Sequence, residues 1–136
     1  MIREINAADT WALRQRVMWP DQPIDYIKLE DDEKGIHFGF FNQDQLVSVV
    51  SLFIDGNSAQ FRKFATDAKE QGKGYGGKLL LHMMEEAVNC GVNMLWCNAR
   101  LDKAPFYEKF GMIKTSRHFI KDGVAFVVMQ KDLLSR

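Results

Sequence analysis

Residues 70–80 read EQGKGYGGKLL, and four of the six residues from Gly72 to Gly77 are glycine. The run matches three phosphate-binding patterns at once: GxGxxG and GxxxxGK, both starting at residue 72, and QxxGxG, starting at residue 71. So many glycines in one short stretch are costly in backbone entropy. This cost favours a loop that holds a ligand over a loop that only starts a helix.

Two of the three patterns lack the context that their chemistry needs. A dinucleotide site requires an apolar strand before the first glycine and an acidic residue at the end of the next strand. Here the polar run DAKEQ precedes Gly72, and the next strand ends in Cys97 and Asn98. A P-loop requires Ser or Thr after its lysine to hold magnesium, and Leu79 occupies that position. QxxGxG needs only backbone N–H groups and a following helix, so we predict a pyrophosphate site.

The hydrophobic spacing predicts strands before this loop and a helix directly after it. The runs 36–41, 45–54 and 58–66 are rich in β-branched and aromatic residues, and NQD and DGN turns separate them. They predict an antiparallel meander. The spacing then changes to 3.6 residues, which predicts a helix that ends at Gly91. The expected apolar face of this helix consists of Leu79, Leu80, Met83, Met84, Ala87 and Val88.

The two ends of the chain complete the expected order of elements. Asp9 or Thr10 can cap a helix that follows a first short strand, and the next prolines end this helix. Beyond the long helix we expect a strand at 92–99 and a short helix at 102–110, which Asp102 can cap. The sequence then predicts a final hairpin that turns at residues 121–123.

These elements predict one domain, residues 1–136, with the order β-α-(α)-β-β-β-α-β-α-β-β. We expect an α+β fold in which helices cover both faces of a twisted, mostly antiparallel sheet. The strands FRKFAT (61–66) and MLWCNA (94–99) should run parallel, because the long helix makes a right-handed crossover between them. The apolar run VAFVVM, residues 124–129, is a candidate contact for a homodimer.

Charge and composition argue against several classes of protein. Lys plus Arg and Asp plus Glu number 18 each, so no large positive field attracts nucleic acid or an anionic membrane. The first residues carry charges where a signal peptide is apolar, and no run approaches about 20 apolar residues, so we expect a cytoplasmic protein. Cys90 and Cys97 lie in apolar segments and are expected to be buried free thiols. The three histidines have no metal-binding spacing, so no metal is expected.

Residues 60–113 resemble the GCN5-related N-acetyltransferase superfamily. EQGKGYGGKLL is similar to the acetyl-CoA pyrophosphate loop of that family, and FRKFATD, MLWCNAR and APFYEKFGM match in order and spacing. The resemblance implies acetyl-CoA as co-substrate, with its pantetheine arm along one strand and its thioester between that strand and the next parallel strand. Leu101 stands where many members bind the cofactor with an asparagine, for which Asn98 or Arg100 could substitute. The implied cofactor-binding residues are Phe64, Thr66, Gln71, Gly72, Lys73, Gly74, Gly76, Gly77 and Asn98.

The resemblance also implies the chemistry, which is direct attack of a neutral amine on the acetyl thioester. Tyr107 occupies the position of the tyrosine that protonates the departing thiolate in the family, although a core aromatic role is the alternative. A backbone N–H near Phe64 would polarise the carbonyl group. The general base is open, because Gln60 stands where histone-type members hold a glutamate. The candidates are a water relay, His37, His118 and a carboxylate of the LEDDE run at 29–33.

The acceptor should bind between the first helix with its following loop, residues 11–33, and the last hairpin. Trp11, Arg14, Trp19 and Asp21 combine aromatic faces with one cation and one anion, which suits a small zwitterion such as an amino acid or its analogue. Packing in the core and at its rim is the alternative for Trp11 and Arg14. A polyamine held by the acidic run is the second choice of acceptor. The alternative function is a non-catalytic acetyl-CoA or CoA sensor or partner subunit.

Overall fold

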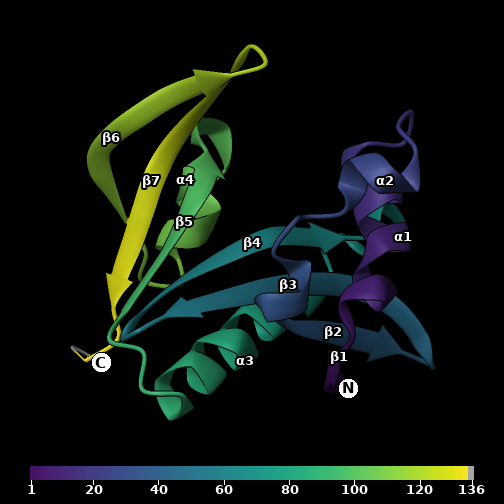
Figure 1. The fold of residues 1–136 in the computed structure, drawn as a ribbon, viewed down its shortest axis with the longest axis horizontal. Helices are drawn as coiled ribbons and strands as arrows, with labels where there is room; N and C mark the ends of the chain where they lie inside the picture. The colour runs from purple at the N-terminus through teal and green to yellow at the C-terminus, as the bar shows by residue number, and fades with distance from the viewer. Residues whose placement is uncertain (135–136) are drawn as a thin grey trace.

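The computed structural model describes residues 1–134, which form a seven-stranded sheet with helices packed on it (Figure 1). The helices are α1 Ala7–Met18, α2 Ile24–Ile27, α3 Tyr75–Asn89 and α4 Ala104–Glu108, with 3-10 turns at Asp32–Lys34, Ala68–Glu70 and Leu101–Lys103. The strands are β1 Ile2–Ile5, β2 Ile36–Asn42, β3 Gln45–Asp55, β4 Ser58–Thr66, β5 Met94–Arg100, β6 Ile113–Lys121 and β7 Val124–Asp132. This order confirms the predicted α+β fold.

The strands lie in the order β1-β2-β3-β4-β5-β7-β6 across the sheet. The first four form the predicted antiparallel meander, and β6 with β7 forms the predicted hairpin. β4 and β5 run parallel, also as predicted, but they pair over three residues only, Ser58–Gln60 with Met94–Trp96. Beyond these residues the two strands diverge, which leaves an opening in the middle of the sheet (Figure 1).

The last strand, whose apolar run was the candidate contact for a homodimer, is internal to the sheet. β7 pairs with β5 on one edge and with β6 on the other. Residues 127–129 of the VAFVVM run are buried. The run therefore offers no free strand edge for a dimer contact, and β6 is the edge strand at this end of the sheet.

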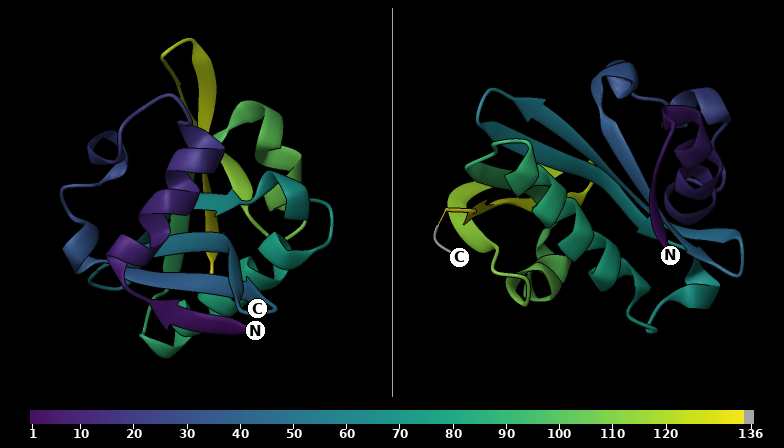
Figure 2. Two further views of the ribbon diagram at one scale, coloured as in Figure 1. Left: turned by 90° about the vertical axis from the view of Figure 1, so that its right-hand side faces the viewer. Right: turned by 90° about the horizontal axis from the view of Figure 1, so that it is seen from below.

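Helices cover both faces of the sheet, and the alternation of side chains along β3 decides which helix each residue meets. Val49 packs with Leu13 of α1 and with Ala65 of β4. Val50, the next residue, belongs to the larger core with Leu80 and the other apolar residues of α3. Figure 2 shows α1 and α3 on opposite sides of the sheet. Of the predicted apolar face of α3, Leu79, Leu80, Met83, Met84 and Ala87 are buried, and Val88 is half-buried against the same core.

The helix starts differ from the predicted ones by a few residues. α1 begins at Ala7, and its N-cap is Asn6, whose N–H donates to Asp9 Oδ2 at 3.1 Å. Asp9 therefore acts from the first turn of the helix instead of capping it, and Thr10 is inside the helix. α4 begins at Ala104 after a 3-10 turn that contains Asp102, so Asp102 does not cap it.

The two cysteines also differ from each other. Cys97 on β5 is buried, as predicted, but Cys90 at the end of α3 is exposed, because it follows the last turn of the helix. Neither forms a disulfide. In residues 1–134 every helix is too short or too polar to cross a lipid bilayer.

Candidate active site

The glycine-rich loop joins β4 to α3 and presents a run of unused backbone donors. Gly72 and Gly74 both have a φ of +85°, a conformation that L-residues rarely adopt. Within the described part of the chain, the N–H groups from Gln71 to Gly77 have no backbone or side-chain acceptor, and the N–H of Lys78 is the first to bond, to Gly74 O at 3.1 Å. Free N–H groups at the N-terminus of a 15-residue helix form a site for an anion.

Gly76 and Gly77 let the first turn of α3 approach its neighbours closely. A Cβ on Gly76 would lie 2.9 Å from the Phe64 ring and from Thr66 Oγ1, and a Cβ on Gly77 would lie 2.9 Å from the Phe110 ring. These two glycines are therefore required for packing as well as for any ligand. The close approach brings the free donors of the loop next to the end of β4.

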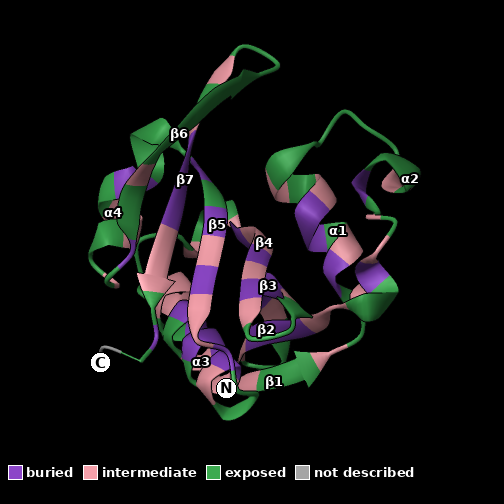
Figure 3. Ribbon diagram, turned by 60° about the vertical axis from the view of Figure 1, so that its left-hand side comes forward, coloured by how far each residue is buried: buried purple, intermediate pink, exposed green. Residues whose placement is uncertain are grey.

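The edge of β4 that faces β5 is free along the second half of the strand. From Phe61 to Thr66, β4 pairs with β3 on its other edge only. Figure 3 shows β4 and β5 side by side below and separated above, with buried residues alternating along β5. An extended ligand can hydrogen-bond to such a free edge like an added strand. This edge leads from the opening in the sheet to the glycine-rich loop.

Tyr107 on α4 lies beside this opening. Its ring is 5.8 Å from the ring of Phe61, 6.3 Å from that of Phe64 and 5.3 Å from that of Phe106, measured between centroids. Burial, together with the nearby Cys97 thiol, raises the pKa of Tyr107 above its ordinary value. The phenol therefore keeps its proton at neutral pH. Among residues 1–134 its hydroxyl has no hydrogen-bond partner, so the proton is available to a ligand.

Cys97 on β5 is a buried thiol close to Tyr107. Burial raises the pKa of the Cys97 thiol to about 12. The thiol of Cys97 therefore keeps its proton at neutral pH, as the phenol of Tyr107 does.

A β-bulge in β4 shapes the other side of the opening. The register between β3 and β4 shifts between Val49 and Ser51, and Lys63 in this segment has a φ of +55°. A bulge inserts one extra residue into a strand and redirects its side chains. As a result, the consecutive residues Arg62 and Lys63 line the same pocket.

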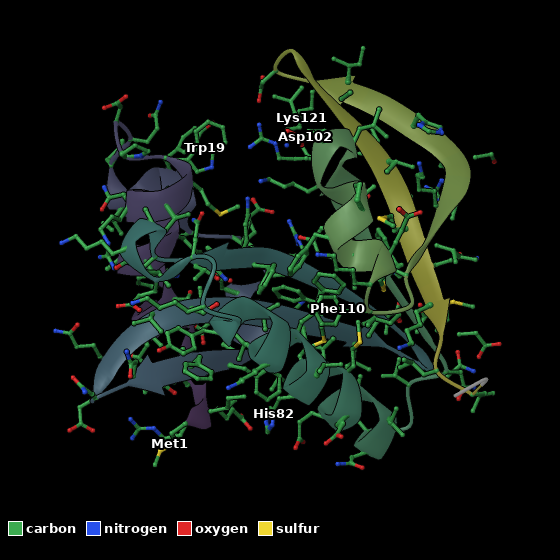
Figure 4. All side chains as sticks on the ribbon, turned by 180° about the vertical axis from the view of Figure 1, so that it is seen from behind. Met1, Trp19, His82, Asp102, Phe110 and Lys121 are labelled. Carbon is green, nitrogen blue, oxygen red and sulfur yellow. The ribbon has the colours of Figure 1, made fainter. Side chains whose placement is uncertain are left out.

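This pocket lies between α1 and α2, the bulge of β4 and the tip of the β6–β7 hairpin. Its volume is about 250 Å³, which is the scale of a small molecule. Figure 4 shows Trp19 and Lys121, from the two outer walls, at the same end of the molecule. The cations and aromatic rings in its lining are Arg14, Arg62, Lys63, Lys121, Trp19 and Tyr26.

A family model described as an acetyltransferase (GNAT) domain matches residues 15–133. The chain belongs to this GNAT family. The matched range contains the glycine-rich loop, the opening between β4 and β5 and Tyr107, which confirms the resemblance found in the sequence. The protein is an N-acetyltransferase, its co-substrate is acetyl-CoA, and a non-catalytic sensor is not favoured.

Related GNAT proteins align with nearly the whole chain. YitI of Bacillus subtilis, an uncharacterized N-acetyltransferase, is 28% identical over 142 residues, which cover 97% of this chain and 95% of YitI. A solved structure from Lactobacillus plantarum has a TM-score of 0.84 at 24% identity and covers 97% of this chain and 98% of its own. The ribosomal-protein-S18-alanine N-acetyltransferase from Escherichia coli has a TM-score of 0.80 at 18% identity and covers 98% and 93%. These structural likenesses show the GNAT fold.

Three of the cofactor-binding residues implied by the resemblance have other partners or positions. The Gln71 side chain donates to Thr66 O at 3.0 Å, which ties the loop to the end of β4. Lys73 forms an ion pair of 2.9 Å with Glu70 at the exposed rim of the loop. Asn98 is exposed and alternates with the buried Cys97 along β5, so it lies on the face of the strand opposite Tyr107.

The structure gives Arg14 an internal role instead of the predicted contact with the acceptor. Its guanidinium is fully buried and binds both carboxylate oxygens of Asp32, at 3.0 and 3.1 Å, and Ser51 Oγ at 2.8 Å. Trp11 Nε1 also donates to Asp32, at 3.1 Å, and Lys28 covers the Trp11 ring. Arg14 and Trp11 thus hold α1 against the 3-10 turn at residues 32–34. Of the four residues predicted to contact the acceptor, Trp19 is exposed in the wall of the pocket, and Asp21 is exposed but is not among the lining residues.

The same network occupies one histidine and two of the four carboxylates among the candidates for the general base. His37 is buried, and its two ring nitrogens lie 2.7 Å from Ser51 Oγ and 2.8 Å from the carbonyl oxygen of Asp32. The nitrogen beside the carbonyl must carry the proton, so both nitrogens are occupied. The carboxylate of Asp32 is paired with Arg14, and that of Asp31 with Arg62 at 3.3 Å. His118 is exposed on the edge strand β6, and it does not line the pocket.

The sequence predicted that the last hairpin borders the acceptor site, but it named no acceptor contact in the hairpin and did not predict the bulge. Lys63, Lys121 and Asp122 line the pocket but were not predicted to act there. The spacing of two phenylalanines is a sign of the bulge. Phe61 and Phe64 both face the core, whereas in a regular strand residues 61 and 63 would share a face. Arg62 and Lys63 lie between these two phenylalanines, where a regular strand would have one residue, and this extra residue forms the bulge.

Proposed function

We propose that this N-acetyltransferase acetylates the primary amine of a small molecule, with an amino acid or an amino-acid analogue as the preferred acceptor. One observation carries the proposal: the opening between β4 and β5 has a different site on each side. The free N–H groups of residues 71–77 and Tyr107 lie on the side of α3 and α4. The pocket with its cations and aromatic rings lies on the side of α1 and α2.

Acetyl-CoA would lie along the first of these sites. The N–H groups from Gln71 to Gly77 would hold its pyrophosphate, and the positive end of α3 would favour its charge. The pantetheine arm would pair with the free edge of β4 from Phe64 to Thr66. The thioester would then lie where β4 and β5 separate, beyond the last paired residues Gln60 and Trp96.

The reaction would proceed by direct transfer. The neutral amine of the acceptor attacks the thioester carbonyl carbon, a C–N bond forms, and the C–S bond breaks. A backbone N–H of the bulge near Phe64 would stabilise the negative charge on the carbonyl oxygen. Tyr107 would donate its proton to the departing sulfur. Because Gln60 cannot accept a proton, the proton of the amine would leave through water.

The charges of the described residues favour an amino acid over a polyamine. Two of the four carboxylates in the acidic run that would attract a polyamine already have partners, since Asp31 pairs with Arg62 and Asp32 with Arg14. The pocket lining contains four cationic side chains and one carboxylate, that of Asp122, and this excess of positive charge disfavours a polycation. The fold alone does not select an acceptor: structural neighbours include an aminoglycoside 6'-N-acetyltransferase and a chimeric spermidine N-acetyltransferase.

An acceptor screen tests this proposal directly. Purified protein is mixed with acetyl-CoA and one candidate amine at a time, and release of the CoA thiol is followed with a thiol reagent. The panel contains amino acids, amino-acid amides, polyamines, aminoglycosides and a short peptide. We expect turnover with members of the amino-acid group. Turnover with polyamines alone, or with the peptide alone, would contradict the proposed acceptor class.

A further inference from the structure

The bulge of β4 places an unusual lysine in the acceptor pocket. Lys63 has a φ of +55°, which side chains other than those of Asn and Asp rarely adopt. It is half-buried, and its side chain lines the pocket next to that of Arg62. A strained backbone around a charged residue in a pocket suggests a function in that pocket.

The positive charges of the pocket are only partly compensated within the protein. Arg14 is neutralised by Asp32 at 3.0 Å, and Arg62 by Asp31 at 3.3 Å. In the part of the chain that the structure describes, neither Lys63 nor Lys121 has a carboxylate within 4.0 Å. The two guanidinium groups therefore have internal partners, and the two ammonium groups do not.

The lysines converge from two different elements. Lys63 comes from the middle of β4, and Lys121 comes from the end of β6 at the hairpin tip. Both line the pocket, and Trp19 and Tyr26, whose rings meet edge to face at 5.2 Å, form part of the same lining. An ammonium group that is partly removed from water gains most from an anionic partner. Burial, followed by the charges of Arg62, Arg14 and Lys121, lowers the pKa of Lys63, and the smaller opposing effect of Asp32 does not cancel this.

We propose that Lys63 and Lys121 form a cation pair that binds an anionic group of the acceptor, a carboxylate or a phosphate, and so determine the acceptor specificity of the enzyme. This inference rests on the proposed function and deepens it: the preferred acceptor carries an acid group at a fixed distance from its reacting amine. The lysines touch the acceptor away from its reacting atoms. They therefore govern its binding, while Tyr107 serves the chemistry.

The test compares acceptors that differ only in the acid group. We measure kcat and KM for an amino acid, its amide, and the matching amine that carries a phosphate, using the wild-type protein and the variants Lys63→Gly, Lys63→Arg and Lys121→Gln. Glycine accepts the positive φ of the bulge, so Lys63→Gly removes the charge without straining the backbone. Lys114→Gln, on the exposed part of β6, serves as the control.

We expect the wild-type protein to prefer an acidic acceptor over its amide. Lys63→Gly should lower kcat/KM for the acid by about 10-fold to 100-fold, mainly through KM, and leave kcat/KM for the amide within about threefold. Lys63→Arg should retain the preference, and the control should not change it. The relative rates for carboxylate and phosphate identify the acid group.

A binding measurement completes the test. In the presence of CoA, an N-acetylated amino acid should raise the melting temperature of the wild-type protein and leave that of Lys63→Gly unchanged. Equal kcat/KM values for acid and amide in the wild-type protein would overturn the inference, and so would the absence of any acid-dependent turnover or stabilisation. Turnover of neutral amines alone would overturn the role of the two lysines but would still show acetyl transfer. Binding of acetyl-CoA without turnover of any amine would contradict the proposed function itself.

Discussion

Replacing Tyr107 with phenylalanine removes one hydroxyl group and little else. The aromatic contacts with Phe61, Phe64 and Phe106 involve the ring, which phenylalanine retains. Within residues 1–134 the hydroxyl has no hydrogen-bond partner that the substitution would leave unpaired. The free energy of unfolding should therefore change by less than about 1 kcal/mol. The affinity for acetyl-CoA should also be unchanged, because the loop and the free edge of β4 remain.

The catalytic loss should be large by comparison. Proton transfer by a positioned acid contributes about 10²-fold to 10⁴-fold to a rate. At about 1.36 kcal/mol for each factor of ten, this corresponds to about 2.7 to 5.4 kcal/mol of transition-state stabilisation. Thiol release at saturating acetyl-CoA and acceptor measures kcat for the wild-type protein and Tyr107→Phe. Thermal unfolding of both proteins, with and without acetyl-CoA, provides the control for folding and binding.

The pH dependence follows from the raised pKa of Tyr107. A proton donor must be protonated, so activity persists below its pKa and falls above it. Because burial raises this pKa, the loss that deprotonation of the phenol would cause lies above pH 10. Wild-type kcat should therefore not fall between pH 8 and pH 10 on account of Tyr107. A Tyr107→Phe variant that keeps more than a third of wild-type kcat would refute the assignment of Tyr107 as the acid.

Three further predictions concern the loop and the network under α1. Gly76→Val should destabilise the protein and raise KM for acetyl-CoA, because its Cβ would lie 2.9 Å from the Phe64 ring; an unchanged KM would argue against the close approach. Gly74→Ala should cost about 1 to 2 kcal/mol of stability at its φ of +85°, measured by urea unfolding, and a neutral effect would contradict this geometry. Asp32→Asn should cost about 3 kcal/mol by leaving Arg14 buried and unpaired. Burial opposes the charge of Asp32, but its hydrogen bonds outweigh burial and lower its pKa. The stability that this carboxylate contributes to the wild-type protein should therefore be lost only below about pH 4. The stability of Asp32→Asn should not show this loss below about pH 4.

The glycine-rich loop and the strands around it could be predicted because their signals are local. Four glycines between a strand and an amphipathic helix predict a loop with free backbone N–H groups, and the structure has this loop. The parallel pairing of β4 and β5 followed from the helix between them. The extent of their pairing did not, because neither sequence shows where the strands part.

The role of Arg14 could not be predicted because its partner is remote in the sequence. Asp32 lies 18 residues away, and Ser51 lies 37 residues away. An arginine on a helix beside tryptophan looks the same in sequence whether it binds a substrate or an internal carboxylate. The bulge at Lys63 escaped for a related reason, since one inserted residue reverses the faces of the following side chains. For these two reasons the predicted contacts lay on α1 and its loop, whereas Arg62 and Lys63 of β4 also line the pocket.

The most direct test of the central claim is the thermal unfolding of the purified protein with excess acetyl-CoA, CoA, NAD or ATP in turn. A ligand at about 100 times its dissociation constant adds about 2.7 kcal/mol to the stability of the folded state, which raises the melting temperature by several degrees. The structure predicts such a rise with acetyl-CoA and CoA, and its loss in Gly76→Val. A rise with NAD or ATP and none with acetyl-CoA would contradict the assignment of residues 71–77 as the pyrophosphate site.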